Sequence, residues 1–559
     1  MNKWFLRLTD NIDRLFFSLI ASPKKILRIA AAVGVVMLIL VVIFPITYRD
    51  SVNYMASVNA LWLHNWRTAF NLTYVPLLFV VSSLFRLLGL NACQCLSLTS
   101  SLLAIGMLFL GYRVLAYYMD RKLAAWGSVL FFLTPPVFRV SFAALTDSAR
   151  WFGFFLSWWM ILLYLERPKF YKLLGIGAAY TVFALVRSEG IVFAGLFSLW
   201  FGFELWRAQR VQQEGIKWLR IVVTVAIPMA FMAFLISPRL IQIYRETGFP
   251  ALDTRQTWAI KGVLAHLTPG KTPTVPEVGS DPLVTYNNHD LKFHYNYLCE
   301  KEFSKRYWSS FISGNYRVFW LFTLLGAVLI IRRRKWGYFH TLVCVFTIGN
   351  AVAYGLMRSN AGRYFYINTY LLMPFTLYGL VCVWEFCCRL SGRIGKAARF
   401  VLVYAAIASM AVCIVSGMHN ILTCDFIAYS KIGKLMQSTA AGAKTRSGTA
   451  HPVYLILGDN YGWGFFCNGN ELVYSAQFKM DSRYRVSEIL TAGVPKDFCS
   501  FAVDPLKDVH ELKPDYLLID GDDFPKDALK DCSKMLESIP QNISGSVRLY
   551  RVNSRLQTK

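Results

Sequence analysis

Four short motifs place charged residues at the ends of long apolar runs, where a charge is costly and usually functional. Each motif contains an acid, an arginine or both. A carboxylate could act as a base toward a hydroxyl group or hold a metal ion, and an arginine could bind a phosphate through two hydrogen bonds. The motifs are Tyr48-Arg49-Asp50, Leu145-Thr146-Asp147-Ser148, Val186-Arg187-Ser188-Glu189-Gly190 and Arg358-Ser359-Asn360-Ala361-Gly362-Arg363-Tyr364.

Each motif also has a simpler structural interpretation. Asp50 and Asp147 could cap the helices that follow them, and Arg187 with Glu189 could form a local ion pair. Taken singly, the motifs do not separate these interpretations from a functional one. Whether the four motifs form one site depends on the elements that position them.

The composition indicates a membrane protein. The chain has 559 residues and a formal net charge of +26, yet only 16% of its residues are charged and its mean hydropathy is +0.40. A hydrophobic content of 55% excludes a disordered chain. A nucleic-acid-binding protein would not need so many Phe, Trp, Leu and Val residues, so we expect no nucleic-acid partner. We expect a polytopic membrane protein instead.

About eleven apolar runs approach the ~20 residues that a membrane-spanning helix needs. No small-residue cleavage site follows the first run, which predicts an uncleaved helix rather than a signal peptide. The runs are 26–46, 96–118, 123–143, 149–165, 173–187, 190–206, 218–237, 316–331, 337–356, 366–387 and 400–418.

Basic residues cluster between alternate pairs of these runs. The positive-inside rule therefore predicts a cytoplasmic N-terminal segment, residues 1–25, and places all four motifs on the outer side of the membrane. The clusters hold 23 basic residues and explain most of the net charge. They are Lys3, Arg7, Arg14, Lys24, Lys25 and Arg28; Arg121 and Lys122; Arg167, Lys169 and Lys172; Arg207, Arg210, Lys217 and Arg220; Arg332, Arg333, Arg334 and Lys335; and Arg389, Arg393, Lys396 and Arg399.

Residues 74–88 form a shorter apolar segment that contains Pro76 and Arg86. If this segment spanned the membrane, every later basic cluster would move to the outer side. We therefore expect it to lie along the outer leaflet or to dip into it, with an ordinary short span as the alternative.

The remaining residues form outer loops and a C-terminal domain. Two outer loops are expected, 47–95 and 238–315, and Tyr54, Val58 and Trp62 recur in the first at the spacing of an amphipathic helix. Strand-like runs alternate with polar stretches in 419–559, which predicts a small extracytoplasmic α/β domain. These runs are Val453–Leu457, Tyr516–Ile519 and Val547–Val552. Polar segments contain Cys299, Cys467, Cys499 and Cys532, which could form disulfides in a pairing that the sequence does not fix.

The ordered set of motifs resembles the GT-C superfamily of membrane glycosyltransferases. The resemblance is greatest to bacterial members related to the protein O-mannosyltransferases and the lipid A aminoarabinose transferase, and it covers about residues 26–390. The matching features are Asp50 before an amphipathic helix, Val75-Pro76-Leu77 through Gly89, the basic turn Asp120-Arg121-Lys122, Leu145-Thr146-Asp147, Arg187-Ser188-Glu189-Gly190, and Gly362-Arg363-Tyr364 before an apolar helix.

This resemblance implies a mainly α, polytopic bundle whose transferase domain covers residues 26–418. It also implies an enzyme that transfers a sugar from a polyprenyl-phosphate donor to an acceptor at the outer membrane face, with inversion. Asp50 would be the catalytic carboxylate and Asp147 the second acid. The donor phosphate would be bound by Arg363, Arg187, Arg358 and Tyr364, and further site candidates are Arg49, Tyr54 and Glu189.

Several alternatives remain open. The acceptor could be a protein, a lipid or a glycan, and a divalent metal ion could bind to Asp50 and Asp147. Many relatives have an acidic pair where this chain has Asp50-Ser51, which weakens the case for a metal. The chain could also be a transporter or flippase of lipid-linked sugars, or a non-catalytic envelope protein. Transporters tend to place their charges near the bilayer midplane, whereas these motifs lie at the predicted outer edge.

Overall fold

The structure is a computed structural model of the whole chain. It describes residues 22–43, 45–46, 49–62, 64, 66–70, 74–211, 217–253, 256–257, 301–314, 317–356 and 362–390, four single helical residues after 390, and six strands between 454 and 552. The backbone of Arg49 and Asp50 is among the described parts, but their side chains are not.

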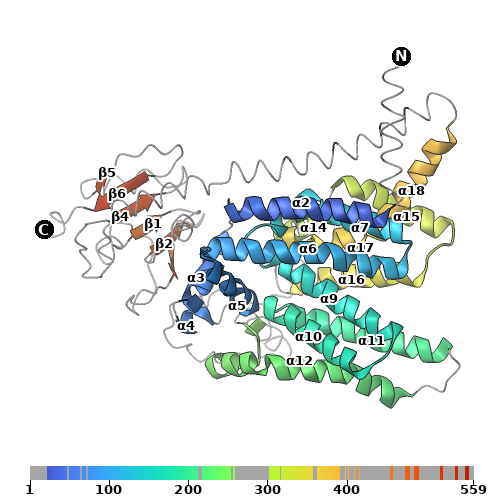
Figure 1. The fold of residues 1–559 in the computed structure, drawn as a ribbon, viewed down its shortest axis with the longest axis horizontal. Coiled ribbons are helices and arrows are strands. Elements are labelled where there is room, and N and C mark those ends of the chain that lie inside the picture. Colours follow the sequence, from blue (N-terminus) through green and yellow to red (C-terminus); the bar gives the residue numbers. More distant parts are fainter. Residues whose placement is uncertain are drawn as a thin grey trace.

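Long apolar helices form the bundle (Figure 1). Helical structure is present at the first ten of the eleven predicted runs, and most of the last run, 400–418, lies outside the described residues. The long helices are α2 (Pro23–Ile43), α6 (Ala92–Tyr118), α7 (Arg121–Phe132), α9 (Asp147–Glu166), α10 (Phe170–Val186), α11 (Gly190–Val211), α12 (Trp218–Thr247), α15 (Arg317–Arg332), α16 (Tyr338–Leu356) and α18 (Met373–Arg389).

Length and hydropathy identify the spans most securely. Four of the described helices, α2, α6, α11 and α12, are long and apolar enough to cross a membrane, and two bent pairs raise this number to six. Large apolar side chains are exposed on the outside of the bundle, for example Leu219 (78%), Phe234 (72%) and Leu321 (70%). Such surface is unfavourable in water and suits contact with lipid. The chain is therefore an integral membrane protein, and the count of eleven spans stays a prediction.

Two of the helical runs are broken, and both breaks lie near the starts of α9 and α18. α7 and α8 (Pro135–Ser141) meet at 68° around Leu133 and Thr134, where Pro135 and Pro136 disfavour a continuous helix. The 3₁₀ turn η5 (Gly362–Phe365) and α17 (Ile367–Leu371) meet α18 at 56°. These breaks let the chain place short, irregular segments next to the starts of long helices.

The α15–α18 pair shows how closely the helices approach. A Cβ atom added at Gly326 would lie 1.9 Å from the Phe375 carbonyl oxygen, and one added at Gly379 would lie 2.1 Å from that of Phe322. The two backbones therefore touch across these glycines, as is common between membrane helices. A hydrogen bond of 2.7 Å between the hydroxyls of Thr323 and Thr376 lies in the same contact.

Short helices cover one end of the bundle (Figure 1). They are α3 (Arg49–Trp62), α4 (Trp66–Ala69), α5 (Leu77–Leu84) and η1 (Phe85–Leu88). α5 and η1 together reach about 20 Å, which is short of the ~30 Å hydrocarbon core. The expectation that residues 74–88 lie along the outer leaflet or dip into it stays a prediction. α3 begins directly after the first long helix, where the amphipathic helix was predicted.

The C-terminal strands form one six-stranded sheet in the order β3-β2-β1-β4-β6-β5. β1 pairs in parallel with β2 and β4, and the other pairs are antiparallel. The three predicted strands are confirmed as β1 (Tyr454–Leu457), β4 (Tyr516–Ile519) and β6 (Arg548–Val552), while β2 (Val473–Phe478), β3 (Tyr484–Ile489) and β5 (Leu536–Ser538) were not predicted.

Other expectations for the outer parts lie beyond the described residues. The helices expected between these strands fall there, as do Cys299, Cys467, Cys499 and Cys532, so the α/β domain at 419–559 stays a prediction. Of the expected loop 238–315, the structure describes the end of α12, a short stretch after it, and α14 (Lys301–Gly314).

Candidate functional site

A backbone pairing brings the starts of α3 and α9 together. Ile46 and Ala143 form an isolated parallel bridge, and the amide of Ala144 donates to the carbonyl of Ile46 at 2.9 Å. Asp50 follows Ile46 by four residues, and Asp147 follows Ala143 by four residues. Because the bridge is parallel, both segments leave it in the same direction. The two predicted acids are therefore carried on neighbouring helix starts.

Asp147 is a buried carboxylate in the first turn of α9. Only 1% of the residue is exposed, and among the described residues neither of its oxygens has a hydrogen-bond partner. Its ion-pair contact is with Arg363, whose Nε lies 4.0 Å from Oδ2. The residue does not cap the helix, because no side-chain capping bond forms at this end of α9. An unsatisfied buried carboxylate is costly and points to a ligand or a reactive role.

Arg187 and Glu189 form a buried ion pair in the turn between α10 and α11. Nη2 of Arg187 donates to Oε1 of Glu189 at 2.7 Å and Nε donates to Oε2 at 3.2 Å. Burial alone would raise the pKa of Glu189, but the charge and hydrogen bonds of Arg187 lower it below the usual range. Nη1 of Arg187 also donates to the hydroxyl of Thr146 at 3.1 Å. This pair therefore ties the 187–189 turn to the residue that precedes Asp147.

Arg150 lies one helical turn after Asp147, on the same face of α9. The residue is 3% exposed. Its Nη1 donates to the hydroxyl of Tyr354 on α16, and its Nη2 donates to the backbone carbonyls of Arg363 at 3.2 Å and Tyr364 at 3.4 Å. Arg150 thus connects α9 to α16 and to the η5 turn.

Tyr364 lies among the arginines of this site. Its ring stacks on that of Tyr354 at 4.8 Å with an interplanar angle of 4°. The guanidinium carbons of Arg187 and Arg150 lie 5.1 and 5.7 Å from its ring centre, within cation–π range. Its carbonyl also accepts a hydrogen bond of 3.4 Å from the Asn350 amide. These contacts fix the η5 turn and leave the Arg363 side chain, at 20% exposure, as the most accessible arginine of the group.

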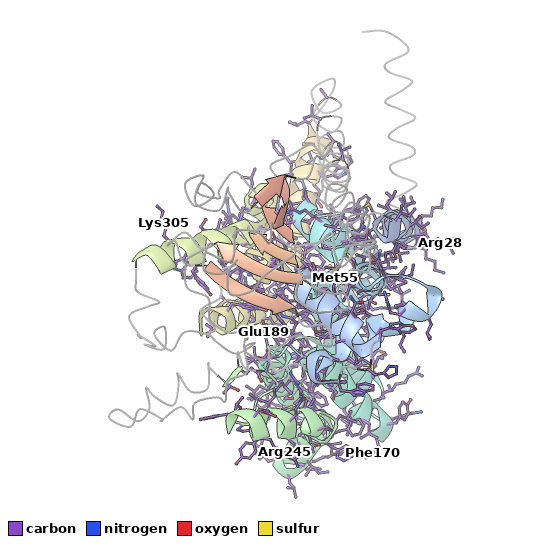
Figure 2. The ribbon with its side chains drawn as sticks, turned by 90° about the vertical axis from the view of Figure 1, so that its left-hand side faces the viewer. Arg28, Met55, Phe170, Glu189, Arg245 and Lys305 are labelled. Atoms are coloured by element: carbon purple, nitrogen blue, oxygen red, sulfur yellow. The ribbon has the colours of Figure 1, made fainter. Side chains whose placement is uncertain are left out.

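We call Asp147, Arg150, Arg187, Glu189 and Arg363 the charged cluster. It contains three guanidinium groups and two carboxylates, and therefore carries one excess positive charge on the described residues. Figure 2 shows Glu189 inside the bundle, whereas Arg28 and Lys305 lie at its edges and are exposed. A fixed positive charge in a low dielectric attracts an anion strongly.

A metal ion fits this arrangement less well than an anion. Among the residues that the structure describes, no three acids, histidines or cysteines lie close enough together to hold a metal. Asp147 has the oxygen chemistry of a hard-cation ligand, but the Arg363 guanidinium beside it would repel a divalent cation. The expected metal at Asp50 and Asp147 therefore gains no support from the described side chains.

The structure brings together five of the residues that the sequence pointed to, namely Asp147, Arg187, Glu189, Arg363 and Tyr364. Arg358 and the side chains of Arg49 and Asp50 lie outside the described residues. Tyr54 is buried beneath α5, where its ring contacts those of Tyr74 and Phe79 at 5.2 and 5.4 Å. Tyr54 therefore packs α3 against α5 and the residues before it.

Sequence reasoning missed Arg150. Its signal was present, because Arg150 lies inside the apolar run 149–165, and a charge within such a run is a candidate for function. Arg150 follows the motif Leu145-Thr146-Asp147-Ser148 by two residues and lies on the same helix face as Asp147.

Arg239 joins segments that are far apart in the sequence. It is 5% exposed, and it donates to the carbonyls of Leu252 at 2.9 Å, Tyr74 at 2.9 Å and Phe70 at 3.2 Å. The C-terminal part of α12 is thereby joined to the segment between α4 and α5. These bonds supply partners to carbonyls of irregular backbone, and the Phe70 carbonyl also accepts from the Gln242 side chain at 2.9 Å.

Comparison with known proteins identifies the fold. No family model and no curated protein sequence matches the chain. Among solved structures, ArnT from Cupriavidus metallidurans bound to undecaprenyl phosphate is similar at a TM-score of 0.53 and 12% identity, over 93% of this chain and 97% of that chain. The same protein in the apo state gives a TM-score of 0.53 and 13% identity over the same shares.

An archaeal oligosaccharyltransferase from Archaeoglobus fulgidus reaches a TM-score of 0.48 at 12% identity, over 81% of this chain and 64% of that one, which is too low to carry an argument. The likeness to ArnT establishes the architecture, because it extends over nearly the whole of both chains. The chain has the GT-C fold, as the sequence resemblance predicted.

Replacing Glu189 with Gln should destabilise the protein, because Arg187 would be left buried without its counter-charge. We expect the free energy of unfolding to fall by about 3–5 kcal/mol. Chemical unfolding of the full chain in detergent measures this change. Glu166→Gln, at the exposed end of α9, is the matched control and should change stability little.

The pH dependence gives a second measure of the same pair. Because the folded-state pKa of Glu189 is lowered, its contribution is present above the unfolded carboxyl pKa, about 4.3, and is lost as the pH falls toward the folded-state value. Acidification in that range should destabilise the parent chain more than Glu189→Gln. Equal acid sensitivity of the two proteins would show that the ion pair is not formed.

Proposed function

We propose that this chain is a membrane glycosyltransferase that takes a sugar from a polyprenyl-phosphate donor and transfers it to an acceptor at the outer face of the membrane. The observation that carries the proposal is the buried Asp147 carboxylate, without hydrogen bonds from the described residues, beside Arg363 in a cluster of net positive charge. The shared fold supports it, since the ArnT structure is one bound to undecaprenyl phosphate.

The proposed reaction is a single displacement at the anomeric carbon. The acceptor hydroxyl forms the new bond to that carbon, the bond from carbon to the phosphate oxygen breaks, and the configuration inverts. Asp50 takes the hydroxyl proton, and the leaving lipid phosphate takes the bonding electrons. Arg363 stabilises the negative charge that develops on this phosphate.

The other predicted residues divide into two groups under this proposal. Nε, Nη1 and Nη2 of Arg187 all donate hydrogen bonds to Glu189 or Thr146. Arg187 therefore supports the site more than it binds the phosphate. Arg363 is then the main phosphate ligand among the described arginines, and Arg358 is a second candidate. Arg49, adjacent to Asp50, is a candidate contact to the donor.

Two other functions compete with transfer. The bent pairs α7–α8 and η5–α18 have counterparts in transporters, whose broken helices bind substrates near the bilayer midplane. The charged cluster instead lies at the starts and ends of long helices. A scaffold without activity would not need an unsatisfied buried carboxylate.

The proposed orientation places the N-terminus in the cytoplasm and the charged cluster and the C-terminal domain outside. It is supported by the helix ends, because α9, α11, α15 and α18 all end at basic clusters, and α9 and α11 begin at the charged cluster. Glu246→Cys, at the far end of α12, should react with a membrane-impermeant maleimide in intact cells. Arg167→Cys should react only after permeabilisation, and the reverse pattern would invert the topology; the parent chain provides the blank.

Asp50→Asn should reduce sugar transfer by about 10²–10⁴-fold, because the general base is lost. Asp147→Asn should also impair transfer. The assay follows release of undecaprenyl phosphate from a panel of undecaprenyl-phosphate-linked sugars with envelope extracts as acceptors.

The matched control is Asp120→Asn. Asp120 caps the start of α7 by accepting hydrogen bonds from the amides of Lys122 and Leu123, and Asn caps a helix equally well. Its transfer rate should equal that of the parent chain. If the parent chain is active and Asp50→Asn transfers sugar at the same rate, Asp50 is not the general base.

A further inference from the structure

We infer that Arg150 is a positioning residue that holds the η5 turn so that Arg363 faces Asp147 at the phosphate site. The inference rests on the proposed function, because it assigns a task within the same site. Arg150 need not touch the substrate. It acts through the backbone that carries Arg363.

The contacts of Arg150 converge on that backbone. Nη2 donates to the carbonyl of Arg363 at 3.2 Å and to that of Tyr364 at 3.4 Å, and Nη1 donates to the hydroxyl of Tyr354. The guanidinium carbon also lies 5.5 Å from the ring centre of Tyr354. One side chain from α9 therefore fixes both the carbonyls of η5 and the ring on which Tyr364 stacks.

The position of Arg150 on α9 sets the geometry of the site. Asp147 and Arg150 are three residues apart on one helix, so their separation is rigid. Arg150 holds the backbone of Arg363, and the Arg363 side chain reaches back to within 4.0 Å of Asp147. The loop formed by these three residues closes on itself, so a shift at Arg150 must move Arg363 relative to Asp147.

The chemistry of arginine is needed for this task. A planar guanidinium can donate in several fixed directions at once, whereas a lysine ammonium acts as a single compact charge. Arg150 is buried, and among the described residues no carboxylate lies within ion-pair distance of it. A buried cation without a direct counter-charge is costly. Its charge supplies the excess of the cluster, which a bound phosphate would balance.

Binding of undecaprenyl phosphate to the full-length protein in detergent tests this inference. Arg150→Lys should weaken binding by about tenfold, although the charge is kept. Undecaprenol, which lacks the phosphate, reports binding of the lipid tail alone and should be unaffected. The matched control is Arg207→Lys: Arg207 also lies over a tyrosine ring, at 4.3 Å from that of Tyr338, but about 25 Å along α11 from the cluster.

A double-mutant cycle separates positioning from general stabilisation. Arg363→Gln alone should weaken binding of undecaprenyl phosphate, and adding Arg150→Lys to it should cause no further loss, because Arg150 acts only through the position of the Arg363 guanidinium. Additive losses, or Arg150→Lys with the affinity of the parent chain, would overturn the inference. Parent chain that binds undecaprenyl phosphate no better than undecaprenol would overturn the proposed function, and this inference with it.

Tyr354→Phe keeps the test decisive if Arg150→Lys fails to fold. This variant retains the stacked ring and removes only the hydroxyl that accepts from Arg150. It should weaken binding of undecaprenyl phosphate several-fold, as expected for one lost hydrogen bond to a charged group. It should have no effect in the Arg363→Gln background, and an undiminished affinity in the otherwise unchanged chain would contradict the inference.

Discussion

The backbone pairing of Ile46 with Ala143 and Ala144 is the contact on which the site depends. It joins the end of the first long helix to the segment between α8 and α9, which is nearly 100 residues away in the sequence. Unpaired backbone is costly inside a membrane protein, so the irregular chain at this point must find partners. The pairing meets this need and brings two acid-bearing helix starts together. The second backbone segment of the pairing follows directly after the broken helix α7–α8.

Electrostatics then gives the site its character. Arg187 and Glu189 neutralise each other, which leaves Asp147, Arg150 and Arg363 to set the local field. These three residues are connected through α9 and the η5 turn, and their summed charge is positive. A bilayer-bound anion with a polar head could balance this charge without any movement of the helices. The Arg363 guanidinium, 4.0 Å from Asp147, partly offsets the cost of burying a carboxylate that has no hydrogen bonds from the described residues.

Much of this structure could be predicted from the sequence, and the exceptions have physical causes. Apolar run length predicted the helices, whereas the placement of residues 74–88 outside the membrane stays a prediction. β-rich runs gave three strands, whereas β2, β3 and β5 lack a comparably apolar run in the sequence. The site motifs were found because charge is rare beside apolar runs. Arg150 was missed, because its role depends on contacts with η5 and α16, which lie more than 200 residues away.

The most direct test of this account is an experimental map of the full-length protein with undecaprenyl phosphate bound in a lipid nanodisc. We predict that the phosphate lies within hydrogen-bonding distance, about 3 Å, of the Arg363 guanidinium, beside Asp147 and the start of α3. A phosphate bound instead at the opposite ends of α9 and α11, near Arg167 and Arg207, would contradict the account.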